Sequence, residues 1–229
     1  MSTKVIFFDI DGTLLSTAGA GQRAMELALV QDFQIEFPFD GVLTAGRTDR
    51  GITDEIFGRY RLKNTDQNRR RFREAYLTHL RSSLKEQPGL LLPQVRELLE
   101  LLSAEKSVTL SLLTGNYADG AWIKLRHFQL DHYFRSGGFG DDHPDRDDVA
   151  RGAVDAVSRA LQKVVRGSDS VVIGDTPADI RCARAIGARA VAVATGGYSA
   201  NDLNSHTPDH LFADFSETAV AVRRILELL

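Results

Sequence analysis

The sequence predicts an α/β fold, a doubly wound parallel sheet with a helical insertion after its first strand. Short apolar runs at 5–8, 108–113 and 170–173 each end in a turn of polar residues, as expected of parallel strands that are buried on both faces. Segments with helical spacing of apolar residues separate these runs. The stretch 15–87 contains such helical patterns but no clear strand, so it predicts a helical unit inserted into the sheet domain.

Length and composition agree with an ordinary globular protein. The chain has 229 residues, 43% hydrophobic and 26% charged, which is enough for one substantial core and a smaller appended domain. A net charge of -3 gives no electrostatic support for binding nucleic acid or an acidic membrane. Cys182 has no partner for an internal disulfide, and no apolar run approaches the roughly 18 to 20 residues of a membrane span. We therefore expect a soluble cytoplasmic protein without nucleic-acid or membrane partners, and the oligomeric state stays open.

Two carboxylates follow the first strand directly. Asp9 and Asp11 stand two residues apart, so an extended backbone would point both side chains the same way, and Gly12 allows a tight turn. Two like charges this close are costly unless a cation lies between them or one carboxyl has a raised pKa. The first solution predicts a magnesium site and the second a proton donor. A solvated turn is the alternative without a function.

Periodicity and turn residues predict the remaining elements in order. Gly19 and Gly21 lie too far beyond the first strand for a dinucleotide fingerprint, and we interpret them as a hinge. Pro38 and Asp40 indicate a loop within 34–45. The expected helices are 22–33, a short one capped by Thr48 and running to about 60, 66–85, one started by Pro93, 118–128, about 149–165, 177–186, and a terminal one capped by Ser216. Two of them have a clear inward face, formed by Phe72, Tyr76, Leu80 and Leu84 in 66–85 and by Val95, Leu98, Leu99 and Leu102 in the helix after Pro93. The later strands are 107–113, a short one or a turn within 133–139, 170–173, 189–194 and 210–212.

The run Asp9-Ile10-Asp11-Gly12-Thr13-Leu14 resembles the first motif of the haloacid dehalogenase superfamily of phosphotransferases. This resemblance implies that Asp9 is the nucleophile that becomes an aspartyl phosphate and that Asp11 is the general acid and base. Thr114 resembles the second motif, whose hydroxyl binds the transferring phosphoryl group, with Gly115 and Asn116 beside it.

The third and fourth motifs supply a cation and acidic residues. The family usually places a Lys just before a proline, which this chain lacks, and the match falls on Arg146, with Arg151 and Lys124 as weaker candidates. The alternative for Arg146 is surface pairing with its acidic neighbours. Asp175 and Asp179 resemble the fourth motif. They imply a magnesium ion held by Asp9, Asp175 and the Asp11 carbonyl, with Asp179 bound to the residues that hold the metal. The alternative for Asp179 is that it only stabilises the start of its helix through the helix dipole.

The resemblance extends over essentially the whole chain and implies a domain organisation. A Rossmann-like core would comprise 1–14 and 88–229, and an α-helical cap would comprise 15–87. The expected activity is a magnesium-dependent phosphatase of a small phosphorylated metabolite. Gly46-Arg47-Thr48-Asp49 resembles the cap segment of phosphoglycolate-phosphatase-like members, and this implies that Arg47 binds an anionic leaving group. The alternative is that Arg47 only flanks the start of a helix. The alternatives are a phosphosugar mutase of the β-phosphoglucomutase type, a non-catalytic phosphoryl-binding scaffold, and a receiver-like switch, against which the long insertion counts.

Overall fold

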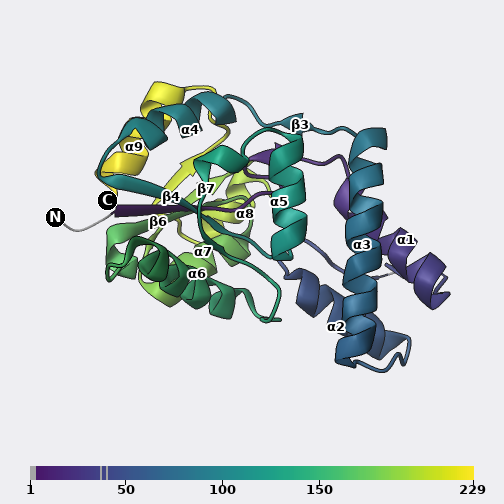
Figure 1. Ribbon diagram of the computed structural model, residues 1–229. Helices are drawn as coiled ribbons and strands as arrows, with labels where there is room; N and C mark the ends of the chain where they lie inside the picture. Colours follow the sequence, from purple (N-terminus) through teal and green to yellow (C-terminus); the bar gives the residue numbers. More distant parts are fainter. Residues whose placement is uncertain (1–3, 37, 40) are drawn as a thin grey trace.

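The computed structural model describes residues 4–36, 38–39 and 41–229. Across these residues the main sheet has six parallel strands in the order β5-β4-β1-β6-β7-β8 (Figure 1). The strands are β1 (Lys4–Phe8), β4 (Val108–Leu113), β5 (Gly137–Gly138), β6 (Ser170–Gly174), β7 (Arg189–Val193) and β8 (His210–Phe212). The first strand therefore lies inside the sheet, between β4 and β6, and the predicted doubly wound parallel fold is confirmed.

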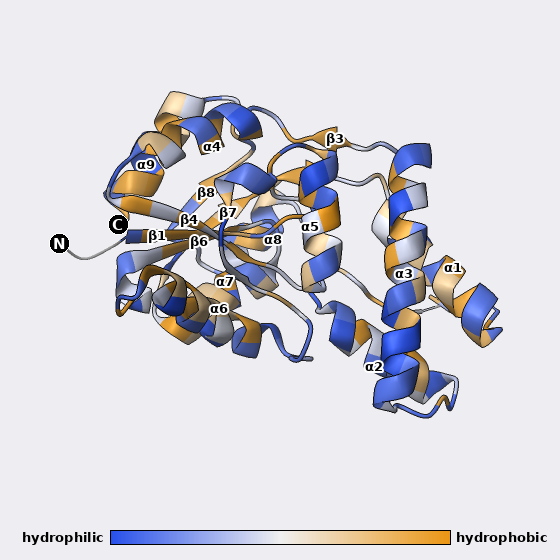
Figure 2. Cartoon of the chain, in the orientation of Figure 1, coloured by the Kyte–Doolittle hydropathy of each residue, from blue (hydrophilic) through white to orange (hydrophobic). Residues whose placement is uncertain are grey.

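Helices cover both faces of this sheet. One face carries α4 (Val95–Ala104), α5 (Ala118–His127) and α9 (Thr218–Glu227), and the other carries α6 (Arg146–Leu161) and α7 (Pro177–Ile186) (Figure 1). Each face of the sheet has its own apolar cluster. Because successive strand residues face opposite sides, Ile6 and Phe8 pack with α4, α5 and α9, and Val5 and Phe7 pack with α6 and α7. The apolar strands lie between helices whose outer faces are hydrophilic (Figure 2). Within the described ranges, no helix is both long and apolar enough to cross a bilayer.

The insertion consists of three helices beside the sheet. They are α1 (Ala20–Phe33), α2 (Asp49–Arg59) and α3 (Asp66–Glu86), which share an apolar cluster of their own to which Tyr117 is added from the start of α5 (Figure 1). The predicted inward residues Phe72, Tyr76, Leu80 and Leu84 are all buried there. The core and cap boundaries proposed above stay a prediction.

A short antiparallel ribbon joins the insertion to the sheet domain. The strands β2 (Leu15–Ser16) and β3 (Leu90–Leu91) pair where the chain leaves the sheet and where it returns. We expected no strand within 15–87, and β2 corrects that expectation, because a two-residue strand has no periodicity to detect. Asp40, one of the residues that indicated a loop at 34–45, lies outside the described residues, as does residue 37; the described part of that stretch has neither helix nor strand.

Several helix starts differ from the predicted ones. Helix α6 begins at Arg146 and not at about 149, because the Asp145 side chain accepts from the Asp147 N–H and caps it. Pro93 lies before α4, whose N-cap is Gln94 in the left-handed region. Ser216 does not cap the last helix, which begins after Glu217. Three short helices, η1 (Asp131–Tyr133), η2 (Gly167–Asp169) and α8 (Ala200–Ser205), carry too few residues for a helical pattern and were not predicted.

Candidate active site

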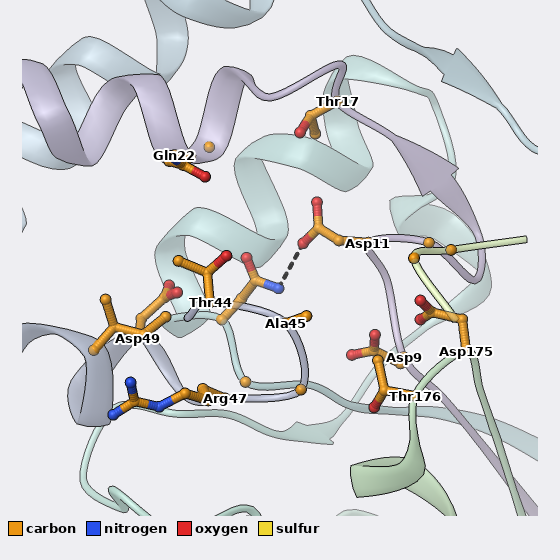
Figure 3. A pocket seen from close by; sticks show the side chains of 18 of the residues that line it. Asp9, Asp11, Thr17, Gln22, Thr44, Ala45, Arg47, Asp49, Asp175 and Thr176 are labelled. Carbon is orange, nitrogen blue, oxygen red and sulfur yellow. Dashed lines mark hydrogen bonds between the residues drawn. The ribbon is translucent and has the colours of Figure 1, made fainter. Parts of the chain in front are cut away.

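One pocket of about 340 Å³ lies at the carboxyl ends of the central strands, where the insertion faces the sheet (Figure 3). In doubly wound sheets the crevice beyond these strand ends is the usual ligand site. Its lining includes seven residues predicted from the sequence: Asp9, Asp11, Arg47, Gly115, Asn116, Arg146 and Asp175. The other two, Thr114 and Asp179, are buried behind it. The structure therefore brings the separate sequence motifs to one place.

Asp9 follows β1 and offers a carboxylate oxygen that no described residue satisfies. The side chain is buried, and its Oδ1 accepts no hydrogen bond although Arg146 Nη2 lies 3.5 Å away. The pKa of Asp9 is raised to about 7, chiefly by burial and also by the nearby Asp179, and Arg146 and the Thr114 hydroxyl oppose this rise. Such an oxygen is available to a ligand or a reacting atom.

Arg146 is the cation that reaches Asp9. As the first residue of α6 its side chain is buried, and its Nη2 binds both Asp9 and Asp179. Asp179 in turn closes a capping box at the start of α7, where its Oδ2 accepts from the Thr176 N–H at 3.0 Å and the Thr176 hydroxyl at 2.7 Å. Both oxygens of Asp179 are thus engaged, so this carboxylate fixes Arg146 and also favours the helix start.

The other candidates for the third-motif cation lie elsewhere. Lys124 contacts Asp11, at 2.5 Å, and Arg151 pairs with Asp148 on the surface of α6. Arg146 makes buried contacts and not the surface pairing that was its alternative. The structure places Arg146 where a third-motif cation would act.

Acidic oxygens beside Asp9 could hold a metal ion. Carboxylate oxygens of Asp9, Asp175 and Asp179 lie within 4.8 Å of one another. Because Asp179 is already bound by Arg146 and Thr176, Asp9 and Asp175 are the carboxylates free for a cation. The pKa of Asp175 is raised to about 8, chiefly by burial and also by Asp9 and Asp179, and a bound positive charge would relieve that cost. Two hard oxygen donors in this position fit a divalent cation of the magnesium class.

Glycine is required on both sides of Asp175. A Cβ on Gly12, whose φ is +85°, would lie 2.4 Å from Asp175 Oδ2, and one on Gly196 would lie 1.7 Å from the same atom. The Asp175 Oδ1 accepts from the Thr13 hydroxyl at 3.1 Å. The turn after β1 and the loop after β7 are therefore shaped to hold this carboxylate.

Asp11 belongs to a second network on the other side of the pocket. Its Oδ2 accepts from Asn116 Nδ2 at 2.9 Å, drawn as the dashed line in Figure 3, and from Lys124 Nζ at 2.5 Å. Asn116 Nδ2 also donates to the Thr114 hydroxyl at 2.8 Å. We expected the side chains of Asp9 and Asp11 to point the same way; both line the pocket, but Asp9 turns toward Arg146 and Asp11 toward Lys124. The extended backbone on which that expectation rested ends at Phe8.

The insertion contributes Arg47 and Asp49. Arg47 Nη1 pairs with Glu55 at 2.5 Å and donates to the Leu43 carbonyl at 3.1 Å, and its Nη2 donates to the Gly51 carbonyl at 3.2 Å. In Figure 3 the guanidinium extends away from Asp9. Arg47 thus lines the pocket with its charge already balanced.

Asp49 is the last residue of the segment Gly46-Arg47-Thr48-Asp49, and no role in the site was predicted for it. It is buried in the pocket wall, its N–H donates to the Gly115 carbonyl at 2.7 Å, and its Oδ2 accepts from the Tyr117 N–H at 2.7 Å. Burial raises the pKa of Asp49 to about 7, although Lys124 and the Tyr117 hydrogen bond lower it. Asp49 therefore joins α2 to the loop that carries the second motif.

Comparisons with known proteins agree with this geometry. A family model described as haloacid dehalogenase-like hydrolase matches residues 3–187. A search of curated protein sequences finds no match.

Solved structures share the fold over nearly the whole chain. A hydrolase from Pseudomonas syringae is 24% identical with a TM-score of 0.69, covering 98% of this chain and 99% of that one. A predicted phosphoglycolate phosphatase from Haemophilus somnus 129pt is 21% identical with a TM-score of 0.68, covering 96% and 98%. A provisionally assigned β-phosphoglucomutase from Thermotoga maritima is 20% identical with a TM-score of 0.63, covering 97% and 99%.

Proposed function

The chain belongs to the haloacid dehalogenase-like hydrolases, and we propose that it is a magnesium-dependent phosphatase that hydrolyses a small phosphorylated metabolite through an aspartyl phosphate on Asp9. The observation that carries the proposal is Asp9 Oδ1, a buried carboxylate oxygen that lines the pocket without a hydrogen bond from any described residue, 3.5 Å from the Arg146 guanidinium. A nucleophile needs this combination of an available oxygen and a nearby cation, because the cation favours the ionised form of the carboxylate.

The first half of the proposed reaction moves the phosphoryl group to the protein. Asp9 Oδ1 forms a bond to phosphorus as the bond from phosphorus to the substrate oxygen breaks, and Asp11 gives a proton to the departing alcohol. Arg146 and the Thr114 hydroxyl stabilise negative charge on the phosphoryl oxygens. Magnesium, held by Asp9, Asp175 and the Asp11 carbonyl, would supply further positive charge there.

The second half returns the protein to its starting state. Asp11, now ionised, accepts a proton from a water molecule as that water attacks phosphorus and the bond to Asp9 breaks. Inorganic phosphate leaves, Asp9 is restored as a carboxylate, and Asp11 is restored as the protonated acid. Asn116 and Gly115, which line the pocket beside Thr114, would orient the phosphoryl group, and Arg47, from the insertion, would face the leaving group.

A phosphomutase is the second candidate, favoured by contacts that hold the insertion against the sheet domain. The Asp49 hydrogen bonds to Gly115 and Tyr117 and the Thr48 hydroxyl bond to the Pro144 carbonyl, at 3.0 Å, close this side of the pocket. A mutase must retain its bound intermediate and exclude water, and a phosphatase must admit one water. The cap role of residues 15–87 is part of both proposals.

Phosphate release from a substrate panel tests the proposal. The panel contains 2-phosphoglycolate, sugar phosphates and nucleoside monophosphates, each with magnesium and with a chelator. We expect metal-dependent release for one class of ester and a covalent phosphate on Asp9, detected by mass spectrometry after an acid quench. Asp9→Asn should abolish both signals in a folded protein, and the exposed Asp155→Asn on α6 is the matched control.

Other outcomes would favour the alternatives. Turnover that appears only with a sugar bisphosphate activator would favour the mutase. Phosphate binding without any turnover, in a folded protein, would favour the scaffold. Wild-type activity in Asp9→Asn would remove the covalent mechanism.

A further inference from the structure

Lys124 is a buried ammonium in the pocket wall that the proposed reaction does not yet use. It is 4% exposed and lies on α5 between Ala121 and Leu125, which are both fully buried. Its Nζ donates to Asp11 Oδ2 and to Asn116 Oδ1, each at 2.5 Å. An ammonium is costly to bury unless it is paired and hydrogen-bonded, so these contacts account for its position.

The insertion leaves room for this side chain. A Cβ on Gly21, in the first turn of α1, would lie 3.3 Å from Lys124 Nζ and 3.5 Å from its Cε. That separation is tighter than most Cβ contacts, so a larger residue at position 21 would press on the ammonium. Lys124 thus fits between the sheet domain and the insertion.

The two buried cations of the pocket form ion pairs with different carboxylates. Arg146 pairs with Asp9 and Asp179, and Lys124 pairs with Asp11. Among the described residues, no ion pair links Lys124 to Asp9 or Arg146 to Asp11. Lys124 therefore acts on the acid and base of the reaction and not on its nucleophile.

Both hydrogen bonds to Asp11 reach the same oxygen. Lys124 Nζ and Asn116 Nδ2 are donors only, and both donate to Oδ2, while Oδ1 accepts from no described residue. An oxygen that accepts from two such donors cannot also present a hydrogen toward them. The proton of a neutral Asp11 must then lie on Oδ1.

Lys124 also fixes which way the Asn116 amide faces. By donating to Asn116 Oδ1, it turns Nδ2 toward Asp11 and the Thr114 hydroxyl. Without Lys124 the amide could rotate and present its oxygen to Asp11 Oδ2, where two acceptors would repel each other.

We propose that Lys124 is a positioning residue that, directly and through Asn116, holds Asp11 so that Oδ1 delivers the proton to the leaving alcohol. This inference rests on the proposed phosphatase reaction. As the bond between phosphorus and the alcohol oxygen breaks, its electron pair goes to that oxygen, which takes the proton from Oδ1. The Asp11 carboxylate that results is bound at Oδ2 by Lys124.

The test compares substrates that need this proton with substrates that do not. Values of kcat/KM report the steps up to release of the alcohol, and an aryl phosphate such as p-nitrophenyl phosphate releases a stable phenolate without protonation. In Lys124→Met we expect kcat/KM for alkyl phosphates to fall about 100-fold, a typical contribution of general acid catalysis, and kcat/KM for the aryl phosphate to change only a few-fold. The exposed Lys106→Met is the control for loss of one lysine.

The outcomes separate this inference from the proposed function. An equal loss for both substrate classes, or no loss for either, would overturn the positioning role. Lys124→Gln keeps a neutral NH2 group that can still donate, and it should show the same selective loss by a smaller factor. This variant also provides the test if the methionine variant does not fold. A wild-type protein inactive on every phosphate ester would overturn the proposed function itself, whereas an active wild type with an unselective Lys124 variant overturns the inference alone.

Discussion

The substitution Asp49→Asn should change how the stability of this protein depends on pH. Asp49 is 8% exposed, and its Oδ2 accepts from the Tyr117 N–H. An asparagine has nearly the same shape, and its side-chain oxygen can accept the same hydrogen bond. The substitution therefore removes the ionisation of position 49 and leaves the link between α2 and the second-motif loop in place.

The expected magnitude follows from the two pKa values of this carboxyl. Burial raises the pKa from 3.8 to about 7, so the folded protein binds the proton more tightly than the unfolded chain does. Unfolding then releases a proton between these two values, and the free energy of unfolding falls as the pH rises through that window. For a single group with these pKa values the fall between pH 5 and pH 8 is roughly 2 to 3 kcal/mol. Above pH 8 this group adds no further change.

Urea unfolding at pH 5, 6, 7 and 8 in the presence of a chelator measures this effect. The free energy of unfolding of Asp49→Asn, minus that of the wild type, should increase by roughly 2 to 3 kcal/mol from pH 5 to pH 8. Asp66→Asn is the control, because Asp66 is also the first residue of a helix but has a side chain that is 90% exposed. Parallel pH curves for wild type and Asp49→Asn would refute the reasoning, since they would mean that Asp49 does not titrate within this range.

Two further substitutions test the nucleophile side of the pocket. Arg146→Lys should lower kcat at least about tenfold, because the shorter lysine would have to place its single nitrogen where Arg146 Nη2 contacts both Asp9 and Asp179. Steady-state kinetics with unchanged far-UV circular dichroism would show the loss, and wild-type kcat would contradict it. Gly12→Ala should weaken magnesium binding at least about tenfold, because the new Cβ would lie 2.4 Å from Asp175 Oδ2 at a φ of +85°. Calorimetric titration with magnesium measures that affinity without turnover, and an unchanged dissociation constant would contradict the role given to Asp175.

Local patterns were sufficient to predict the parts of the site that follow strands. Asp9 and Asp175 each come directly after a buried apolar run, and the carboxyl ends of neighbouring parallel strands meet at one edge of a sheet. Periodicity likewise predicted the inward face of α3 and the exact bounds of α7. Such features depend on residues close together in the chain, which is why the sequence alone could indicate them.

Contacts between distant segments could not be predicted in this way. Lys124 meets Asp11 across 113 positions and Asp49 meets Tyr117 across 68, and both contacts depend on how a helix is rotated against the sheet. One signal was present for Lys124. It lies at helical spacing among apolar residues of α5, and a lysine on a buried face requires a partner. No comparable signal marked Asp49, since a carboxylate in a first helical turn is common without a tertiary role.

The charges that Arg47, Lys124 and Asp49 bring to the pocket lining bear on the proposed substrate class. Arg47, which the sequence suggested for an anionic leaving group, is held by Glu55, and Lys124 is held by Asp11. Asp49 adds a carboxyl to the same wall. A leaving group with its own carboxylate would therefore meet two paired cations and a further acid, whereas hydroxyl groups could donate to Asp49 and Asp11. On this balance we expect esters with a neutral, hydroxylated leaving group to be hydrolysed faster than 2-phosphoglycolate, and the panel of esters compares the two directly.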